Sequence, residues 1–388
     1  MFDQNQLHQF QSLETPFYYY DLTLLKQTLL ACKQASSKYD FRVHYALKAN
    51  FNRPILLAIK EAGFGADCVS GNEVKKVIEL GFTPKKVVFA GVGKSDKEIL
   101  DALDCNIFCF NVESLQELKV INGLAQQQNK VAKIAIRINP NVDADTHKNI
   151  TTGLDENKFG INQWELDSCI RILGQSKNLH FIGIHFHIGS QITNLEVFKD
   201  LCVKINEIHQ WFDQCGFQPT VLNVGGGLGV DYDHPDEELI PNFEMYFGIF
   251  NKNLNRKPGQ EIHFELGRAL VAQCGHLISR ILYIKNGKKK NFMILDAGMT
   301  ELIRPALYQA YHKIENISKP ESAAIEIVKY DVVGPICEST DCFAHDMELP
   351  KSDRGDLMAI RSAGAYGEVL ASGYNLRDRV RAVYSSIV

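Results

Sequence analysis

The chain of 388 residues is 45% hydrophobic and 23% charged, with a formal net charge of −4. This length exceeds a single small core, so we expect one large and one smaller domain in an ordinary globular protein. The weakly acidic balance argues against a nucleic-acid surface, and no apolar run is long enough to span a membrane.

The amino terminus and the cysteines indicate a cytoplasmic protein. The sequence begins MFDQNQLHQF, which lacks the basic start and apolar core of a signal peptide. Its ten cysteines form no C-x-x-C pair and lie mostly inside apolar runs. This usage predicts reduced thiols that fill the core.

Strand-like and helical patterns alternate up to about residue 270. A strand-like run, Phe17–Tyr20, and a helical pattern from Leu22 to Lys38 come first. Strand-like runs follow at residues 43–47, 65–69, 86–90, 107–112, 131–138, 182–187, 221–225 and 261–265. Helical patterns lie between them, near 54–62, 72–80, 96–104, 113–127, 163–174, 195–214 and 242–255. The alternation implies parallel strands and predicts a closed (β/α)8 barrel of the TIM type over residues 22–270, with an open doubly wound sheet as the alternative.

Beyond residue 270 the pattern changes to strands without regular helices. Runs at 276–285 and 291–296 flank an Asn286-Gly287 turn, and further runs lie at 324–333 and 356–361. We expect a β-rich second domain of sandwich or barrel type, made of residues 1–21 plus 271–388.

Polar residues collect where the predicted barrel strands end, which is where barrel enzymes carry out their chemistry. Lys48, in the stretch YALKAN, follows the first of these strands. It is either a solvated loop residue or an amine in a partly apolar pocket, where a lowered pKa would let it form a Schiff base. The other strand ends supply Asp67, Ser70, Arg137, Asn139, His185, His187, Ser190, Gly225, Gly226, Gly227, Glu265, Gly267 and Arg268.

The glycines 225–227 follow the seventh predicted barrel strand. They either form a tight turn or expose N–H groups to an anion, and barrel phosphate sites favour this position. Ser190 offers a hydroxyl to the same phosphate. A phosphate together with the Lys48 amine suggests pyridoxal 5'-phosphate. Glu265 would then keep the pyridine nitrogen protonated, unless it pairs with an arginine for stability.

His185 and His187 allow a competing interpretation. An H-x-H pattern on a strand places both imidazoles on one face, which is also how barrel hydrolases bind zinc. The other predicted strand ends offer no further His/Asp set with ligand spacing. We therefore expect no metal, with one histidine stacked on the cofactor ring and the other packed in the barrel.

Four segments of the second predicted domain carry more polar groups than packing requires. Arg304, in DAGMTELIRPALY, is a candidate clamp for a substrate carboxylate. Cys337 beside Glu338, in GPICES, is a candidate proton donor, although such a thiol alone is more often buried and inert. The other two segments are AGAYG and SGYN.

These residues together resemble the pyridoxal-phosphate decarboxylases of the alanine-racemase fold type, and most closely the diaminopimelate decarboxylase family. The resemblance runs from Thr15-Pro16 to Tyr374-Asn375. Its signatures are YALKAN, GADCVSGNE, TGLDENKFGI, HFHIGSQI, NVGGGLGVDY, FELGR, DAGMTELIRPALY, GPICES and AGAYG, which are weak singly and specific in this order and spacing. The chain departs from the family at Leu266, where proline is commoner, and in the run LRDRV after Asn375.

The resemblance implies a role for each matching residue. His187 would stack on the cofactor ring, and Cys337 would return a proton after carbon dioxide leaves. The cofactor would be held by Lys48, His187, Ser190, Gly225, Gly226, Gly227, Glu265, Gly267, Arg268 and Tyr366. The substrate would be bound by Arg268, Arg304, Tyr308, Glu338 and Tyr366. In this family the Cys-Glu segment comes from a second protomer, so a homodimer is implied.

The implied reaction is the decarboxylation of meso-2,6-diaminopimelate to L-lysine and carbon dioxide, the last step of lysine biosynthesis. A carboxy-lyase for ornithine, arginine or carboxynorspermidine is the near alternative, although such relatives have no need of the arginine in DAGMTELIRPALY. A non-catalytic pyridoxal-phosphate carrier or regulator is an alternative of another class, but it would not require Cys337, Glu338 or a second domain. A zinc hydrolase is the most distant alternative.

Overall fold

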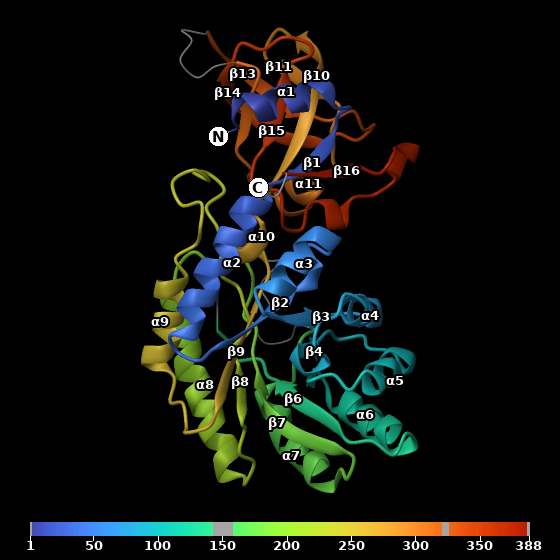
Figure 1. The fold of residues 1–388 in the computed structure, drawn as a ribbon, viewed down its shortest axis with the longest axis vertical. Helices are drawn as coiled ribbons and strands as arrows, with labels where there is room; N and C mark the ends of the chain where they lie inside the picture. The colour runs from blue at the N-terminus through green and yellow to red at the C-terminus, as the bar shows by residue number, and fades with distance from the viewer. Residues whose placement is uncertain (1, 143–157, 320–325, 386–388) are drawn as a thin grey trace. The chain divides into compact units, whose positions relative to one another are not determined.

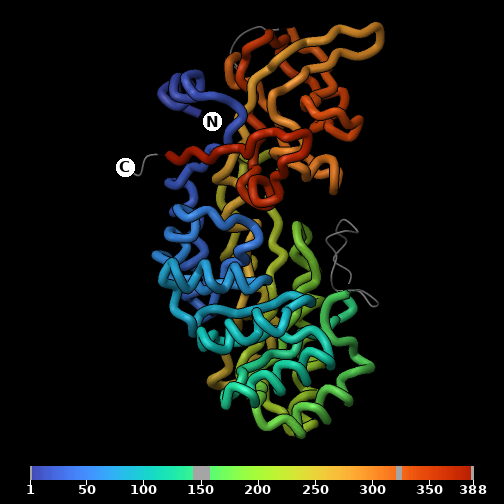
Figure 2. The backbone as a smooth tube through the Cα atoms, turned by 90° about the vertical axis from the view of Figure 1, so that its right-hand side faces the viewer, coloured from blue at the N-terminus to red at the C-terminus, as the bar shows by residue number. Residues whose placement is uncertain are grey.

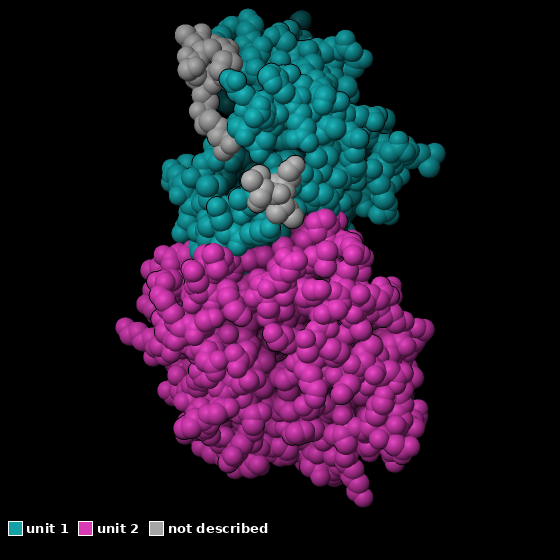
Figure 3. Space-filling view, in the orientation of Figure 1, with its two compact units in different colours: residues 1–27, 230–241, 268–388 teal, residues 28–229, 242–267 magenta. Residues whose placement is uncertain are grey.

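A computed structural model of the chain describes residues 2–142, 158–319 and 326–385. The chain forms two compact units, which Figure 3 colours separately. Unit 1 comprises Met1–Gln27, Val230–Pro241 and Arg268–Val388, and unit 2 comprises Thr28–Gly229 and Asn242–Gly267. The division at residues 21/22 and 270/271 stays a prediction about folding domains. It did not anticipate that residues 230–241 group with unit 1.

Unit 2 contains a closed barrel of parallel strands, which confirms the predicted TIM-type fold (Figure 1). The last barrel strand pairs with the first, with His44 opposite Glu265, so the sheet has no free edge and the open doubly wound alternative is excluded. The strands are β2 Arg42–Ala46, β3 Gly65–Cys68, β4 Val87–Phe89, β5 Cys109–Val112, β6 Ala132–Arg137, β7 Leu179–His185, β8 Val221–Asn223 and β9 Glu261–Leu266.

Helices follow the barrel strands close to the predicted ranges. Serines at positions 70, 95 and 114 cap three successive helices, because each hydroxyl accepts the backbone N–H of a glutamate three residues later. These caps explain why the helices begin so soon after the strands. The helices are α2 Leu22–Ser37, α3 Arg53–Glu61, α4 Gly71–Glu79, α5 Asp96–Asp104, α6 Leu115–Gln127, α7 Leu166–Gln175, α8 Glu196–Gln214 and α9 Phe243–Asn253.

An aromatic layer joins α8 and α9 to the barrel. The rings of Phe198 and Tyr246 meet edge to face with centroids 5.0 Å apart, and Phe250 and Phe264 meet in the same way at 5.0 Å. All four side chains are buried, and burial of each such side chain contributes about 1.5–3 kcal/mol to folding. This packing fixes the outer face of β9, the strand that carries Glu265.

Unit 1 is β-rich, as predicted. Its sheet has the order β12-β15-β10-β11-β13-β14, and β1 pairs with both β10 and β16. The predicted turn at Asn286-Gly287 is confirmed, because Asn286 pairs with Asn291 in the β10–β11 hairpin, the long gold arm in Figure 2. The strands are β1 Phe17–Tyr20, β10 Gly275–Asn286, β11 Asn291–Leu295, β12 Ile314–Asn316, β13 Ile327–Val333, β14 Cys342–Pro350, β15 Leu357–Ile360 and β16 Arg381–Tyr384.

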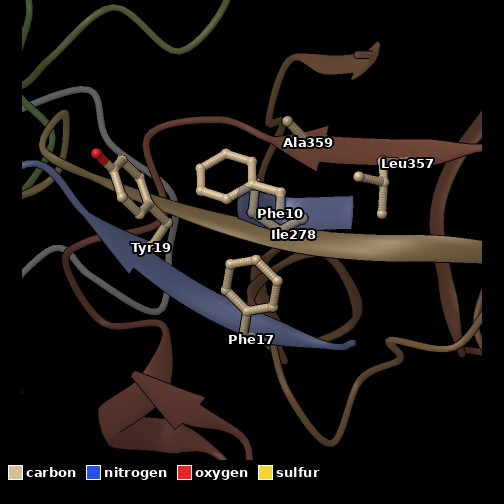
Figure 4. Close-up of a cluster of buried hydrophobic side chains, with 6 residues drawn as sticks. All are labelled: Phe10, Phe17, Tyr19, Ile278, Leu357 and Ala359. Atoms are coloured by element: carbon tan, nitrogen blue, oxygen red, sulfur yellow. The ribbon is translucent and has the colours of Figure 1, made fainter. Parts of the chain in front are cut away.

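Three helices in unit 1 were not predicted: α1 Gln4–Ser12, α10 Arg268–Val271 and α11 Arg304–Tyr308. α1 begins with a capping box between Asp3 and Gln6 and contributes Phe10 to the core of the unit. The ring of Phe10 lies 5.5 Å from that of Phe17 and 4.9 Å from that of Tyr19, both edge to face. Figure 4 shows the cluster Phe10, Phe17, Tyr19, Ile278, Leu357 and Ala359.

The cysteines of the described chain are free thiols, and most of them fill the core as predicted. Burial raises the pKa of Cys202 and Cys169 to about 12, so these thiols stay protonated. Within the described ranges, no helix combines the length and the apolar character that crossing a membrane requires.

Candidate active site

Lys48 lies at the carboxyl end of β2, in the one-turn 3-10 helix η1 Leu47–Ala49. The turn is braced by the buried Tyr45 hydroxyl, which donates to the Asn50 carbonyl at 2.8 Å. Lys48 is exposed, so its position agrees with the first of the two alternatives, a solvated loop residue, and the turn carries it to the rim of the barrel. Its charge tends to lower the pKa of both Asp67 and His187, so it acts on other residues of the predicted set.

Glu265, on β9, accepts hydrogen bonds from three other barrel strands. Asn111 Nδ2 and Asn223 Nδ2 donate to Oε1 at 2.9 and 2.7 Å, and His185 Nε2 donates to Oε2 at 2.8 Å. Burial by itself raises the pKa of the Glu265 carboxyl, but the charge and hydrogen bond of His185 outweigh it and hold that pKa below its usual value. The carboxylate is therefore buried and ionised.

The glycine turn packs directly against Glu265. A Cβ on Gly226 would lie 1.9 Å from the Glu265 carbonyl oxygen, and one on Gly225 would lie 2.2 Å from the Phe186 carbonyl oxygen. Gly225 N–H donates to Asn223 Oδ1 at 3.0 Å, and Gly226 N–H donates to His187 Nδ1 at 3.3 Å. Asn223 and His187 thus accept hydrogen bonds from two of the three backbone N–H groups of the glycine turn. Neither of them accepts the N–H of Gly227.

His187 and Ser190 follow β7 and lie beside this turn. The bond from Gly226 requires an unprotonated Nδ1, and burial, followed by the charge of Lys48, holds the pKa of His187 well below its usual value. His187 is therefore a neutral imidazole. His185, two residues earlier, is tied to Glu265 and is the histidine packed inside the barrel.

Asp67, at the carboxyl end of β3, is a second buried carboxyl group of the barrel. It is 3% exposed, and its Oδ1 has no hydrogen-bond partner among the described residues. Burial raises its pKa well above the usual value, the charge of Glu265 adds to this effect, and Lys48 opposes it. The pKa of Asp67 is therefore shifted in the opposite direction to that of Glu265.

Glu113, Arg137 and Asn139 form a separate polar cluster after β5 and β6. Arg137 NH1 contacts Glu113 Oε1 at 2.9 Å and Oε2 at 3.0 Å in a buried ion pair. Asn139 donates to Asn162. This cluster borders the signature TGLDENKFGI, of which residues 152–157 lie outside the described ranges.

In unit 1, Arg268 and Arg304 converge on Tyr232. Arg268 NH1 donates to the Tyr232 hydroxyl at 2.6 Å, and the Arg304 guanidinium carbon lies 4.7 Å from the centroid of the same ring. Burial tends to raise the pKa of Tyr232, but the two guanidinium groups outweigh it and lower that pKa. Arg268 also faces the ring of Tyr366, at 4.9 Å from its centroid.

His312 orients Arg304. Arg304 NH1 donates to His312 Nε2 at 2.8 Å, and His312 Nδ1 donates to the Arg361 carbonyl at 2.8 Å. Burial, followed by the charge of Arg304, lowers the pKa of His312 to about 3, so this imidazole is a neutral acceptor. Arg304 thereby holds its charge at a fixed position while it is 4% exposed.

Tyr232 and His312 were not predicted as site residues. Tyr232 closes the signature NVGGGLGVDY, so the motif contained a signal for it. His312 follows DAGMTELIRPALY with no motif of its own. Only the fold reveals that it contacts Arg304.

Cys337 and Glu338 are exposed, in the loop between β13 and β14. Glu338 Oε1 accepts from the Tyr374 hydroxyl at 2.6 Å, and Cys337 N–H donates to Asn375 Oδ1 at 3.4 Å. Two of the polar segments that are distant in sequence, GPICES and SGYN, therefore contact each other in unit 1. The exposed Cys337 is not the inert buried thiol that a lone cysteine usually is.

The described residues contain no group of three or more His, Cys, Asp or Glu side chains that could hold a metal ion. The donor set does fit pyridoxal phosphate. Three donors reach Glu265, and a carboxylate offers about four lone-pair positions, so Oε2 can accept one further N–H such as that of a pyridinium. The glycine turn and Ser190 lie beside it in the same unit.

Comparisons with known proteins agree with this geometry. The family described as "Pyridoxal-dependent decarboxylase, pyridoxal binding domain" matches residues 24–272. A diaminopimelate decarboxylase of Bacteroides thetaiotaomicron is 55% identical over 96% of each chain, and one of Helicobacter pylori is 43% identical over 98% of this chain and 92% of its own. A crystal structure of the Helicobacter pylori enzyme complexed with L-lysine matches with a TM-score of 0.91 and 41% identity, covering 98% of this chain and 94% of that one.

Proposed function

This chain belongs to the pyridoxal-dependent decarboxylases and, within them, to the diaminopimelate decarboxylase family, and from this we propose that it converts meso-2,6-diaminopimelate to L-lysine and carbon dioxide. It is a carboxy-lyase of lysine biosynthesis that uses pyridoxal 5'-phosphate. The observation that carries the proposal is the buried, ionised Glu265, held by three donors in the same barrel as Lys48.

Bound pyridoxal phosphate supplies a protonated ring that accepts the electron pair left when the carboxylate departs. The residues of the chain make this possible. Glu265 would keep the proton on the ring nitrogen, because its own pKa is held low and a buried carboxylate stabilises a neighbouring cation. Lys48 would hold the aldehyde of the cofactor, and the neutral His187 would stack on the ring without adding charge.

The phosphate would lie against Ser190 and the glycine turn. We assign Gly227 the leading backbone contact, because Asn223 and His187 take the N–H groups of Gly225 and Gly226. Gly267, Arg268 and Tyr366 would complete the cofactor site. The Arg268 guanidinium faces the Tyr366 ring and so holds both side chains in position.

Arg304 would bind the distal carboxylate of the substrate. It is buried, its charge has no carboxylate partner among the described residues, and His312 and Tyr232 hold it in place. A substrate without that carboxylate would leave a buried guanidinium unpaired, which costs about 1–3 kcal/mol or more. Arg268 and Tyr308 would contact the same substrate. Specificity for diaminopimelate over ornithine therefore resides in Arg304.

Glu338 would receive the distal ammonium, and the Cys337 thiol would donate a proton to the carbon that has lost carbon dioxide. This step consumes one proton for each carbon dioxide released, and the thiol then regains a proton from solvent. The exposure of both residues supports a role at a contact between copies. We propose a homodimer in which the Cys337–Glu338 segment of one copy serves the site of the other, in the cytoplasm, where thiols stay reduced.

A carbon dioxide release assay tests the function directly. We expect release from meso-diaminopimelate that depends on pyridoxal phosphate, and little release from ornithine or arginine. Equal turnover of ornithine would favour the alternative of a polyamine-type decarboxylase, whereas cofactor binding without any turnover would favour a carrier or regulator.

Arg304→Ala separates the roles within this assay. We expect it to lower kcat/KM for diaminopimelate by roughly 10²-fold while the cofactor stays bound, because the variant loses a charged contact made only to substrate. Arg304→Lys, which keeps the charge, serves as the matched control and should recover part of the activity. Parallel loss of cofactor and activity in Arg304→Ala would assign Arg304 to the fold instead.

A further inference from the structure

A cavity of about 520 Å3 lies at the amino ends of the barrel strands, the end opposite to Lys48 and Glu265. Its walls come from residues that begin or precede several strands, among them Arg42, Gly65, Lys86 and Glu261. The volume lies within the range of roughly 300–1,000 Å3 found for small-molecule sites. No residue of the candidate active site lines it.

Three rings that line the cavity, those of His44, His263 and Phe108, pack against one another. His44 Nδ1 donates to the Lys86 carbonyl at 3.1 Å, and His44 Nε2 lies 2.9 Å from His263 Nδ1. Phe108 stacks on His263 with centroids 5.3 Å apart. A Cβ on Gly65 would lie 2.4 Å from both His44 Nδ1 and the Lys86 carbonyl oxygen, so a glycine there preserves their bond.

Two ammonium groups meet at one glycine of this cavity. Lys86 Nζ donates to the Gly63 carbonyl at 2.9 Å, and a Cβ on Gly63 would lie 3.5 Å from Lys33 Nζ. In the described chain neither ammonium has a carboxylate within salt-bridge distance, and Lys33 instead lies 6.0 Å from the Phe64 ring centroid. Both lysines are exposed, and an anion bound between them would offset the repulsion of the two like charges.

The carboxylates that line the cavity are already paired. Arg42 NH1 contacts Asp40 at 2.8 Å, and Arg42 NH2 lies 3.7 Å from Glu261. Glu261 also accepts from His263 Nε2 at 3.1 Å. The charge left without a partner in this cavity is therefore positive, in a chain whose net charge is −4.

We propose that this cavity binds a small multivalent anion, of the phosphate or polycarboxylate class, between Lys33 and Lys86. Ammonium groups provide strong charge-assisted hydrogen bonds to such oxygens. The volume admits a small molecule and not a folded partner, and it exceeds what one phosphate group fills. Lys85, which also lines the cavity, extends the positive charge for a ligand with a second anionic group.

Calorimetric titration of the holoenzyme tests the proposal, because bound pyridoxal phosphate keeps added anions out of its own phosphate site. Pyrophosphate and citrate are titrated separately at constant ionic strength. The anion that binds with the lower Kd shows whether the site prefers phosphates or polycarboxylates. We expect one saturable site per chain and a Kd at least about 10-fold higher in the double variant Lys33→Gln/Lys86→Gln. Lys119→Gln removes the same charge from exposed α6, outside the cavity, and should bind like the unmodified chain.

A second measurement does not depend on variants. Saturating anion should protect Lys33 and Lys86 from acetylation, as read by mass spectrometry, and leave Lys119 reactive. Absence of a saturable site for both anions, or an equal Kd in all three proteins, would overturn the proposal. Equal labelling of Lys33 and Lys86 with and without anion would do the same.

Discussion

Two buried carboxyl groups lie near the carboxyl ends of strands in one barrel, and their surroundings shift their pKa values in opposite directions. Glu265, on β9, is met by donors from β5, β7 and β8, and its pKa lies below the usual value despite the effect of burial. Asp67, on β3, has an oxygen without a partner among the described residues, and burial raises its pKa well above the usual value.

The difference shows that neighbouring charges and hydrogen bonds, more than depth of burial, set the direction in which the pKa of an acid shifts in this barrel. Both groups are nearly inaccessible, at 7% and 3% exposure. The charge of His185 and three donors replace the water that Glu265 loses, whereas Asp67 Oδ1 has no such partner among the described residues, so burial raises the pKa of Asp67. The ionised group is the one that the proposed function needs beside a cationic ring.

Lys48→Ala should cause the largest loss of activity among the substitutions near these two carboxyl groups. It removes the cation that opposes the raised pKa of Asp67, and it removes the amine that would hold the cofactor. We expect turnover to fall by roughly 10³-fold or more and the visible absorption band of the bound cofactor to disappear. A variant that still decarboxylates would remove Lys48 from its proposed role.

Glu265→Gln should have the next largest effect. An amide in this position cannot neutralise a protonated ring nitrogen, so we expect kcat to fall by roughly 10²- to 10³-fold while the fold is retained. The folded-state pKa of Glu265 is depressed, so its contribution to stability is present above the usual glutamate pKa of about 4.3 and is lost as pH falls. Thermal denaturation should therefore show that the variant is less stable than the unmodified chain at neutral pH. This difference in stability should become smaller as the pH is lowered.

Asn111→Leu tests whether the donors set the charge of Glu265. The substitution removes one of the two bonds to Oε1 and leaves the carboxylate itself in place. We expect a loss of about 1–3 kcal/mol in the free energy of unfolding at neutral pH and a smaller drop in kcat than in Glu265→Gln. Urea denaturation measures the first quantity. An unchanged stability would mean that His185 and Asn223 suffice.

Asp67→Asn should have the smallest effect, and unlike the other substitutions it should raise the stability of the fold at neutral pH. The folded-state pKa of Asp67 is raised, so its stability contribution is full below the usual aspartate pKa of about 3.9 and is lost as pH rises toward the folded-state pKa. A neutral amide avoids this loss, and we expect Tm to rise by roughly 2–4 °C at neutral pH with no gain near pH 4. A lower Tm at neutral pH would show that Asp67 is ionised and paired.

Local patterns predicted much of the fold. The barrel strands and the hairpin at Asn286-Gly287 follow from periodicity and turn residues, which act over a few positions. Helix α1 was missed because its cap, Asp3 with Gln6, is followed by few apolar residues, and its single buried side chain is Phe10. The sequence left open whether Lys48 is solvated or lies in a pocket, because a strand pattern does not reveal the 3-10 turn that follows it.

The sequence by itself determined the order of strands and helices, the residues at strand ends and the family, since these depend on spacing along the chain. Only the tertiary structure decided which of those residues meet. Closure of β9 on β2 brings Asn111, His185 and Asn223 to Glu265 across separations of 154, 80 and 42 residues. Such contacts depend on the register of a closed sheet, which no local pattern encodes, and this register lowers the pKa of one buried carboxyl group and raises that of the other.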